Sequence, residues 1–103
     1  MWAQIIKTRV KPGSEADVAF LMDQFKVAEQ ADSGLIRSTT MRDQNDPDSL
    51  YIMVVFNSEE SARAREQDPR RETGLASARE TMARIFEGAP EFVDLTVVSE
   101  TVS

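Results

Sequence analysis

Apolar and β-branched residues gather in four short runs that predict β-strands. Residues 2–10 form the first run and end at a KPG turn, and residues 35–42 form a second, more polar run. The third run, residues 50–57, is apolar at both odd and even positions, whereas residues 91–100 alternate. The sequence therefore predicts a protein built around four strands.

The stretch after the first strand has the periodicity of a helix. One apolar stripe is formed by Val18, Leu21, Met22, Phe25 and Ala28. This spacing predicts a helix of roughly 15 residues. Ser14, with Asp17 three residues later, predicts a capping box at its start, and Gly34 follows its end.

Two further helices are predicted between the third and fourth strands. Asn57, followed three residues later by Glu60, resembles a helix start, so a short helix is expected over SEESARAREQ. Asp68 and Pro69 then favour a new helix, because aspartate caps a helix and proline suits its first position. We expect this last helix to run to about Phe86, with its stripe formed by Leu75, Ala78, Met82, Ile85 and Phe86.

The resulting order, β-α-β-β-α-α-β, is that of an α+β fold of the ferredoxin-like, split βαβ type. It predicts one antiparallel four-stranded sheet covered by helices on one face, in a single domain over residues 1–103. The apolar third strand would leave large side chains wet on the other face, at roughly 1.5–3 kcal/mol each. We therefore expect a homodimer paired through that sheet face. The alternative is a central strand shielded by long neighbouring side chains.

Composition narrows the chemistry that the chain can perform. The formal net charge is −6 and the arginines are interleaved with acids, which disfavours nucleic acids and anionic membrane surfaces. The chain has no cysteine and no histidine. Thiol chemistry, the usual zinc sites and the Ser-His-Asp arrangement are therefore excluded, and no metal is expected. No signal-peptide pattern or membrane span is visible, so a cytoplasmic location is expected.

Four arginines lie close together at Arg63, Arg65, Arg70 and Arg71. Four acids accompany them within residues 59–71, so a solvated lattice of charges is the simplest interpretation. Glu59 precedes Arg63 by four residues, which favours a surface ion pair. Arg70 and Arg71 fall in the first turn of the last predicted helix, where positive charge opposes the helix dipole. This tolerated cost indicates a partner carboxylate or an anionic ligand.

Arg65 is the arginine that we single out. The short helix around it offers only Ala62 and Ala64 to the sheet. Either this helix lies close to the sheet, or it leaves a cavity roofed by alanines and Arg65. We hypothesise the cavity, in which Arg65 would reach an acidic or phenolate group.

Two other side chains are candidates for polar chemistry. Tyr51 could donate a hydrogen bond to an oxyanion, or it could lie at an interface with its hydroxyl in water. Asp94 lies in an otherwise apolar stretch. If its face is buried, desolvation would raise its pKa and make it a usable base, and otherwise it faces solvent or pairs with an arginine.

Nearly the whole chain, about residues 3 to 98, resembles the antibiotic biosynthesis monooxygenase family of dimeric α/β-barrel proteins. The resemblance rests on VKPGSEADVAFLMDQF, on SGLIRSTTMRDQNDPDSLYIMVVFNSEESARAREQDPRR and on EFVDLTVV. Its most specific features are the KPG turn, the Asp-Pro loop before the third strand and the FNSEESA joint. Family members include quinone-forming monooxygenases and haem-degrading enzymes.

The resemblance implies a pocket between the sheet and the helices, faced by Trp2 and Gln4. An indole N–H and an amide there could bind a phenol or carbonyl oxygen. Trp2 could equally be packing alone. The haem-degrading members use a histidine, an asparagine and a tryptophan at positions that align here with Gly74, Ile6 and Arg65. None fits, so neither haem nor another cofactor is expected.

The leading functional hypothesis is a cofactor-independent monooxygenase acting on a small electron-rich aromatic such as a hydroquinone. The substrate-binding candidates are Trp2, Gln4, Tyr51 and Arg65, and no catalytic residue is identified. The alternative is a non-catalytic ligand-binding or regulatory dimer of the same fold. An isomerase or lyase is a third possibility, and it would need a buried carboxylate such as Asp94.

Overall fold

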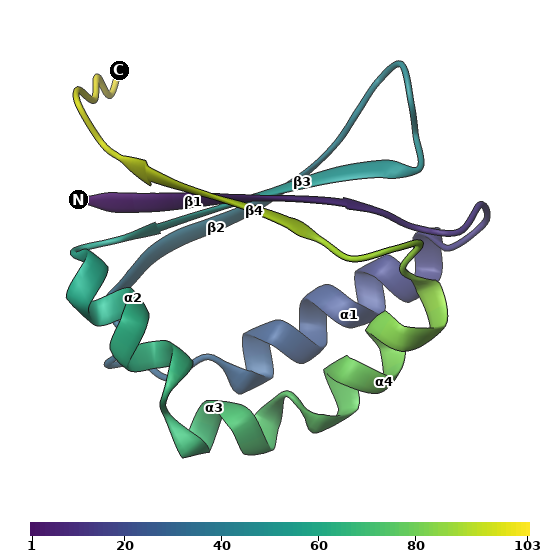
Figure 1. Cartoon of the computed structure of the whole chain (residues 1–103), viewed down its shortest axis with the longest axis horizontal. Coiled ribbons are helices and arrows are strands. Elements are labelled where there is room, and N and C mark those ends of the chain that lie inside the picture. The colour runs from purple at the N-terminus through teal and green to yellow at the C-terminus, as the bar shows by residue number, and fades with distance from the viewer.

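The structure, a computed structural model, describes all residues 1–103 and places four helices on one side of a four-stranded sheet (Figure 1). The elements in chain order are β1 (Trp2–Arg9), α1 (Glu15–Ala28), β2 (Leu35–Arg42), β3 (Ser49–Phe56), α2 (Glu59–Glu66), α3 (Pro69–Gly74), α4 (Ala76–Ile85) and β4 (Glu91–Thr96). None of these helices combines the length and the apolar character that crossing a bilayer requires.

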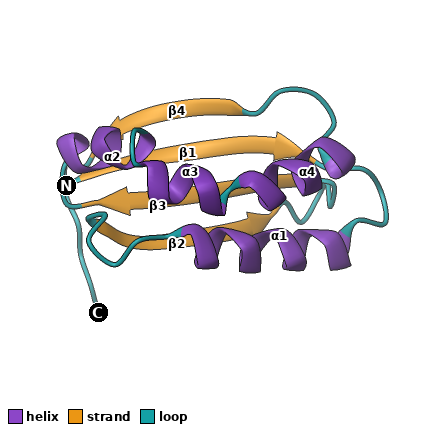
Figure 2. Ribbon diagram, turned by 90° about the horizontal axis from the view of Figure 1, so that it is seen from below, coloured by secondary structure: helices purple, strands orange, loops and turns teal.

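The sheet has the strand order β2-β3-β1-β4, and every neighbouring pair is antiparallel. Figure 2, seen from the helix side, shows α1 in front of β2, α2 near β4 and β1, and α3 and α4 in front of the central strands β1 and β3. This arrangement confirms the predicted α+β fold of the ferredoxin-like type. The helix-bearing side is called the inner face below, and the opposite side the outer face.

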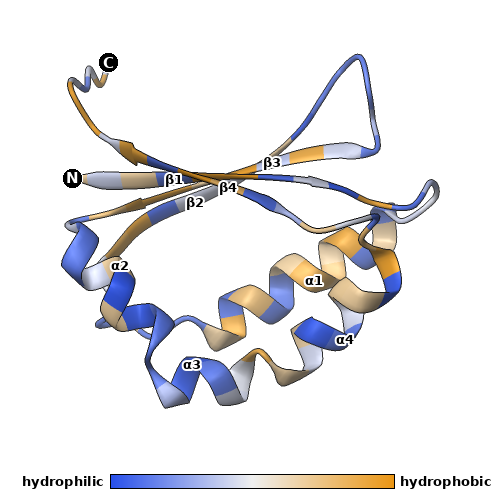
Figure 3. Ribbon diagram, in the orientation of Figure 1, coloured by the Kyte–Doolittle hydropathy of each residue, from blue (hydrophilic) through white to orange (hydrophobic).

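The inner face carries two apolar clusters. One lies under α1 and α4 and consists of Val10, Val18, Leu21, Ala28, Leu50, Leu75, Ala78 and Ile85. The other lies under α2 and consists of Trp2, Ile52, Val54, Phe56 and Ala62. Figure 3 shows why they differ: α1 carries much apolar surface, whereas α2 and α3 are mostly hydrophilic. The second cluster is therefore roofed by polar side chains, and a binding site is best sought there.

The first two helices begin at or within one residue of the predicted positions, but their side-chain caps differ from the prediction. The Ser14 hydroxyl donates to the carbonyl of Lys11 at 2.5 Å and caps no helix N–H, so the predicted capping box is wrong. The hydroxyl meets the KPG turn instead. In α2 the cap is Ser58, one residue beyond Asn57, and its hydroxyl accepts from the N–H of Ser61 at 3.1 Å. The predicted cap, Asn57, lies one residue before this N-cap position and makes no capping bond to the helix.

The predicted start at Asp68 and Pro69 is confirmed, but the helix it opens is broken. The Asp68 carboxylate accepts from the N–H of Arg70 at 2.9 Å, and Pro69 is the first residue of α3. The single helix expected to reach Phe86 divides at Gly74 and Leu75 into α3 and α4. A Cβ built on Gly74 would lie 2.9 Å from both Cα and Cβ of Ala28, so glycine permits α3 to touch the end of α1.

The outer face is apolar at its centre and is crossed at one end by the chain's last residues. Its side chains follow from the register and include Ala3, Ile5, Tyr51, Met53, Val55, Val93 and Leu95. After β4, residues 97–103 pass over one end of this face (Figures 1 and 2). Arg37 of β2 donates a hydrogen bond to Glu100 of this segment at 2.7 Å. Val98 and Val102 in this tail remain 94% and 83% exposed.

Candidate functional site

Beneath the polar side chains of α2, the second cluster has an aromatic floor that includes Trp2. The register of β1 and β3 places Trp2 opposite Phe56, and their rings lie 6.1 Å apart at a tilt of 54°. Ala62 of α2 is buried in the same cluster, so the helix lies close to the sheet at this residue and not above an open cavity. Trp2 is itself 7% exposed. The indole thus forms part of a closed aromatic floor.

Arg63 covers that floor from α2. Its guanidinium carbon lies 5.0 Å from the centre of the Trp2 ring, within the range of a cation–π contact. The same guanidinium bonds Asp94 of β4 at 2.7 Å, in addition to Glu59 and Glu66 of its own helix at 3.2 and 3.1 Å. The predicted Glu59 pair is confirmed. Arg63 therefore ties α2 to the edge strand while it shields Trp2.

Gln4 and Asp94 complete this network. The Gln4 amide nitrogen donates to an Asp94 carboxylate oxygen at 2.9 Å. The hydrogen bond from Gln4, followed in size by the one from Arg63, stabilises the charged carboxylate, so the pKa of Asp94 is lowered. Its side chain is 47% exposed. Of the two alternatives for Asp94, the partly exposed carboxylate paired with an arginine is present, and the buried base is not.

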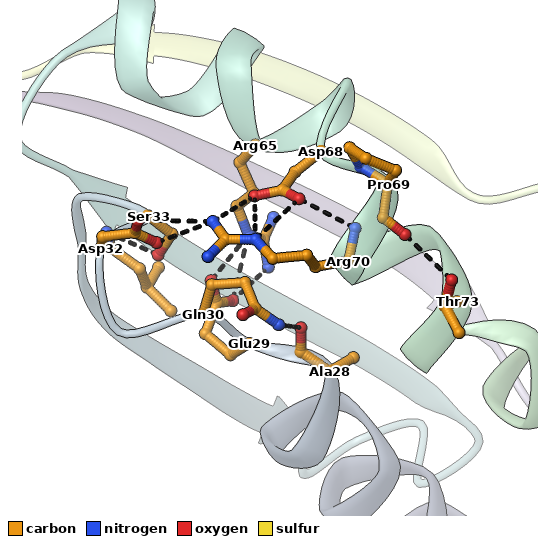
Figure 4. Close-up of polar contacts among 11 residues, drawn as sticks. Ala28, Glu29, Gln30, Asp32, Ser33, Arg65, Asp68, Pro69, Arg70 and Thr73 are labelled. Atoms are coloured by element: carbon orange, nitrogen blue, oxygen red, sulfur yellow. Dashed lines mark hydrogen bonds and ion pairs between the residues drawn. The ribbon is translucent and has the colours of Figure 1, made fainter.

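Arg65 approaches the aromatic floor from the other side of α2. Its guanidinium carbon lies 5.1 Å from the centre of the Phe56 ring. It also makes three hydrogen bonds of 2.6 to 3.1 Å to the carboxylate of Glu29, which follows the end of α1 (Figure 4). The acidic group that Arg65 reaches in the structure is thus a carboxylate of its own chain, a partner that the sequence did not reveal.

This ion pair is well enclosed, with the Arg65 and Glu29 side chains only 18% and 20% exposed. Burial by itself would raise the pKa of Glu29. The hydrogen bonds from Arg65, helped by Ser33 and by the charges of both neighbouring arginines, outweigh it, and the pKa of Glu29 is lowered. Glu29 is therefore ionised at neutral pH and holds Arg65 in place over Phe56.

The two arginines that open α3 have different surroundings. Arg70 bonds Asp68 at 2.7 Å and Asp32 at 3.0 Å, and Figure 4 shows the three side chains converging. These carboxylates explain how Arg70 is tolerated at a helix start. Arg71 is half-buried and makes no side-chain hydrogen bond or ion pair of its own. A partner carboxylate is therefore present for Arg70 and absent for Arg71.

Tyr51 lies apart from the other candidates. It faces Lys7 across the β1–β3 pair on the outer face, whereas Trp2 and Gln4 lie on the inner face. Tyr51 lines a surface cavity of about 260 Å³ together with residues that include Lys7, Arg9 and Glu91. The structure thus brings Trp2, Gln4 and Arg65 to one region and leaves Tyr51 on the other side of the sheet.

The β-α-β-β-α-α-β order and the antiparallel four-stranded sheet, covered by helices on one face, place the chain in the class of ferredoxin-like proteins. The sequence model of the family described as "Antibiotic biosynthesis monooxygenase" matches residues 1–76. The chain belongs to this family. No sequence among curated proteins matches it.

Solved structures of similar fold cover almost the entire chain. A candidate antibiotic biosynthesis monooxygenase from Chloroflexus aurantiacus J-10-fl is 22% identical, with coverage of 98% of this chain and 96% of that one and a TM-score of 0.69. A variant of SnoaB, a cofactor-independent oxygenase from Streptomyces nogalater, is 13% identical, with coverage of 96% and 94% and a TM-score of 0.72. A variant of MhuD with two manganese protoporphyrin IX bound per active site is 14% identical, covers both chains completely and has a TM-score of 0.81.

The residues present do not fit a haem held by a helix histidine. The chain has no histidine, and at Gly74, the position that the family resemblance sets against the histidine, even a methyl group would collide with Ala28. The aligned tryptophan position is Arg65, which is engaged by Glu29. No group of three or more acidic side chains gathers to hold a metal ion either.

Proposed function

We propose that the protein is a cofactor-independent monooxygenase of small electron-rich aromatic compounds, such as hydroquinones, and that it acts as a homodimer. The observation that carries the proposal is the Trp2–Phe56 pair on the inner face, with a guanidinium at each ring. Family membership supports the same class of reaction. An aromatic substrate would stack on this floor once α2 moves away from it.

The chemistry requires little from the protein. A phenol that has lost its proton can reduce O₂ itself; one oxygen atom enters the ring, the other leaves as water, and the substrate supplies all the electrons. The protein contributes a dry, shaped site and positive charge that stabilises the phenolate. Arg65 supplies that charge in this proposal, and the Gln4 amide and the Trp2 indole N–H are the neutral donors.

The homodimer is proposed from the outer face. Met53 and Val93 are only half-buried there, Leu95 is 38% exposed and Met41 is 43% exposed. Sheet-to-sheet packing with a second copy would remove this apolar surface from water, at a gain of about 25 cal/mol for each Å². The inner face is already covered by helices, so a second copy would remove little further apolar surface from water there.

A non-catalytic ligand-binding dimer is the second candidate. It is favoured by one observation: the carboxyl groups with a clearly shifted pKa, which are Glu29, Asp46, Asp68, Glu72 and Asp94, are all shifted downward. None is prepared to accept a proton from a phenol near pH 7. The oxygenase would then depend on acidic phenols or on proton transfer to water.

Oxygen uptake separates the two candidates. Consumption of O₂ with a panel of hydroquinones, above the rate without protein, is expected for the oxygenase. Replacement of Trp2→Phe should lower the rate by about tenfold, because one oriented donor contributes on the order of 1.5 kcal/mol. Tyr51→Phe, on the outer face, is the matched control and should leave it unchanged. Ligand binding without O₂ consumption would favour the binding dimer, and a loss in the control alone would move the site to the outer face.

A further inference from the structure

Arg71 differs from every other arginine in the chain. Of the nine arginines, seven form an ion pair with a carboxylate. Arg42 is exposed and donates to the carbonyl of Pro47. Arg71 alone has no bonded partner, although it is half-buried where α3 approaches the end of α1. Its five N–H donors are therefore free for a ligand.

The acids around Arg71 are already occupied. Three glutamates lie near enough for their charges to act on it, namely Glu29, Glu66 and Glu72. Each is hydrogen-bonded to a different arginine: Glu29 to Arg65, Glu66 to Arg63 and Glu72 to Arg79. None of these three carboxylates bonds Arg71 in the structure, although their charges act on it.

The guanidinium of Arg71 is both partly desolvated and close to a second guanidinium. Burial lowers the pKa of Arg71, and the nearby guanidinium of Arg65 lowers it further. The carboxylate of Glu29 is bonded to Arg65, and only its charge acts on Arg71. An anion at this point would offset both contributions.

The anion has a definite shape and neighbourhood. A guanidinium binds a carboxylate through two parallel N–H bonds, a match that an ammonium group does not offer. Arg65, which acts on Arg71, lies over the Phe56 ring of the aromatic floor. With α2 displaced, as the proposed function requires, a ligand with its carboxylate at Arg71 would have its aromatic ring on the side of Arg65 and Phe56.

We propose that Arg71 and Arg65 form a subsite for a carboxylate, and that the protein selects small aromatic acids over their uncharged analogues. This inference rests on the proposed function for the aromatic part of the ligand. It adds the charged group, which the family resemblance did not suggest. Arg71 supplies the free fork of donors, and Arg65 supplies a second positive charge held by Glu29.

The test compares 2,5-dihydroxybenzoate with 2,5-dihydroxybenzamide, which share the hydroquinone and differ in charge. Binding is followed by calorimetry and by the fluorescence of Trp2, the single tryptophan. The wild type should bind the benzoate about tenfold or more tightly than the amide, as one charge-assisted contact provides. Arg71→Gln should reduce the preference to about twofold or less, with Arg84→Gln, whose exposed partner is Asp17, as the matched control.

Stability measurements keep a folding defect separate from a binding defect. Arg71→Gln removes an unpaired cation, so its melting temperature should equal or exceed that of the wild type. Equal binding of the two probes, absence of binding by both, or a preference that survives Arg71→Gln would each overturn the inference.

The outcome is distinguishable from that of the proposed function. Selective binding of the benzoate without oxygen uptake would uphold the carboxylate subsite and reject the oxygenase. Oxidation of neutral hydroquinones as fast as the acids, with no effect of Arg71→Gln, would uphold the oxygenase and reject the subsite.

Discussion

Arg65 and Glu29 form the most enclosed of the ten ion pairs in the protein. Their three hydrogen bonds connect α2 to the residue that follows α1, two segments far apart in the sequence. Removing one partner would leave the other charged and mostly shielded from water, which costs more than the loss of a surface pair. Arg65 therefore has a structural role beside the proposed binding role.

Replacement of Glu29→Gln tests this role. It should lower the free energy of unfolding at pH 7 by about 1–3 kcal/mol, measured by urea denaturation, because Arg65 would lose its counter-charge. Asp17→Asn, which breaks the exposed pair with Arg84, is the control and should change it by about 0.5 kcal/mol or less. Equal effects of the two variants would contradict the prediction.

The same variant has a pH signature. The pKa of Glu29 is lowered by folding, so its contribution to stability is present above the unfolded-state pKa and is lost as the pH falls through the folded-state value. The wild type should therefore lose more stability than Glu29→Gln between about pH 5 and pH 3. Parallel curves for the two proteins over this range would exclude the linkage.

At the residue scale the sequence predicted partners along one helix better than partners across the fold. The Glu59–Arg63 pair follows from a spacing of four and is present. The pairing of Arg65 with Glu29 joins residues 36 positions apart, and no local pattern announces it. For the same reason, the Gln4–Asp94 bond depends on the β1–β4 register, which only the folded sheet fixes.

At the element scale, three of the four strands were predicted to within one residue at each end, whereas the fourth, expected over 91–100, ends at Thr96. The helix boundaries were predicted less well. Residues 35–42 were expected as a strand and form β2, because alternation and β-branched side chains act locally. The break between α3 and α4 was missed because the apolar stripe around Leu75 continues across it. The break lies beside the close approach of Gly74 to Ala28 of α1, a tertiary contact that no local pattern reveals.

Gly74→Ala provides the corresponding prediction. In an isolated helix this change would stabilise by up to about 1 kcal/mol. Here the new methyl group would lie 2.9 Å from the backbone of Ala28, so we expect destabilisation by about 1–3 kcal/mol in thermal or urea unfolding. Ser77→Ala, at an exposed position of α4, is the matched control and should be neutral or slightly stabilising. A more stable Gly74→Ala protein would show that α1 and α3 can separate at little cost.

At the scale of the whole molecule, the two faces of the sheet have different tasks. The inner face carries the core and the proposed site, whereas the outer face carries Ile5, Met53 and Val93 without a covering layer of helices. This division could be predicted from residues 50–57 alone, because β3 is apolar at both odd and even positions. Which side each residue faces, as for Tyr51, required the register.

The proposed dimer can be tested by charge. Sedimentation equilibrium of the wild type should give about twice the chain mass of 11.5 kDa. Met53→Glu should shift it toward the single-chain mass, because two buried carboxylates would face an apolar interface. Phe20→Glu, which alters an apolar side chain 54% exposed on α1, should remain a dimer. A wild-type protein of single-chain mass at high concentration would exclude the sheet-to-sheet dimer.

The segment 97–103 lies over part of the outer face that a second copy would need, and Arg37 and Glu100 hold it there through a partly exposed ion pair. An internal competitor subtracts the free energy of its own docking from that of association. Added salt weakens such a pair and also screens the repulsion between two chains that each carry a charge of −6. Ionic strength would then control dimerisation. Residues 97–103 would set the protein concentration at which the dimer forms.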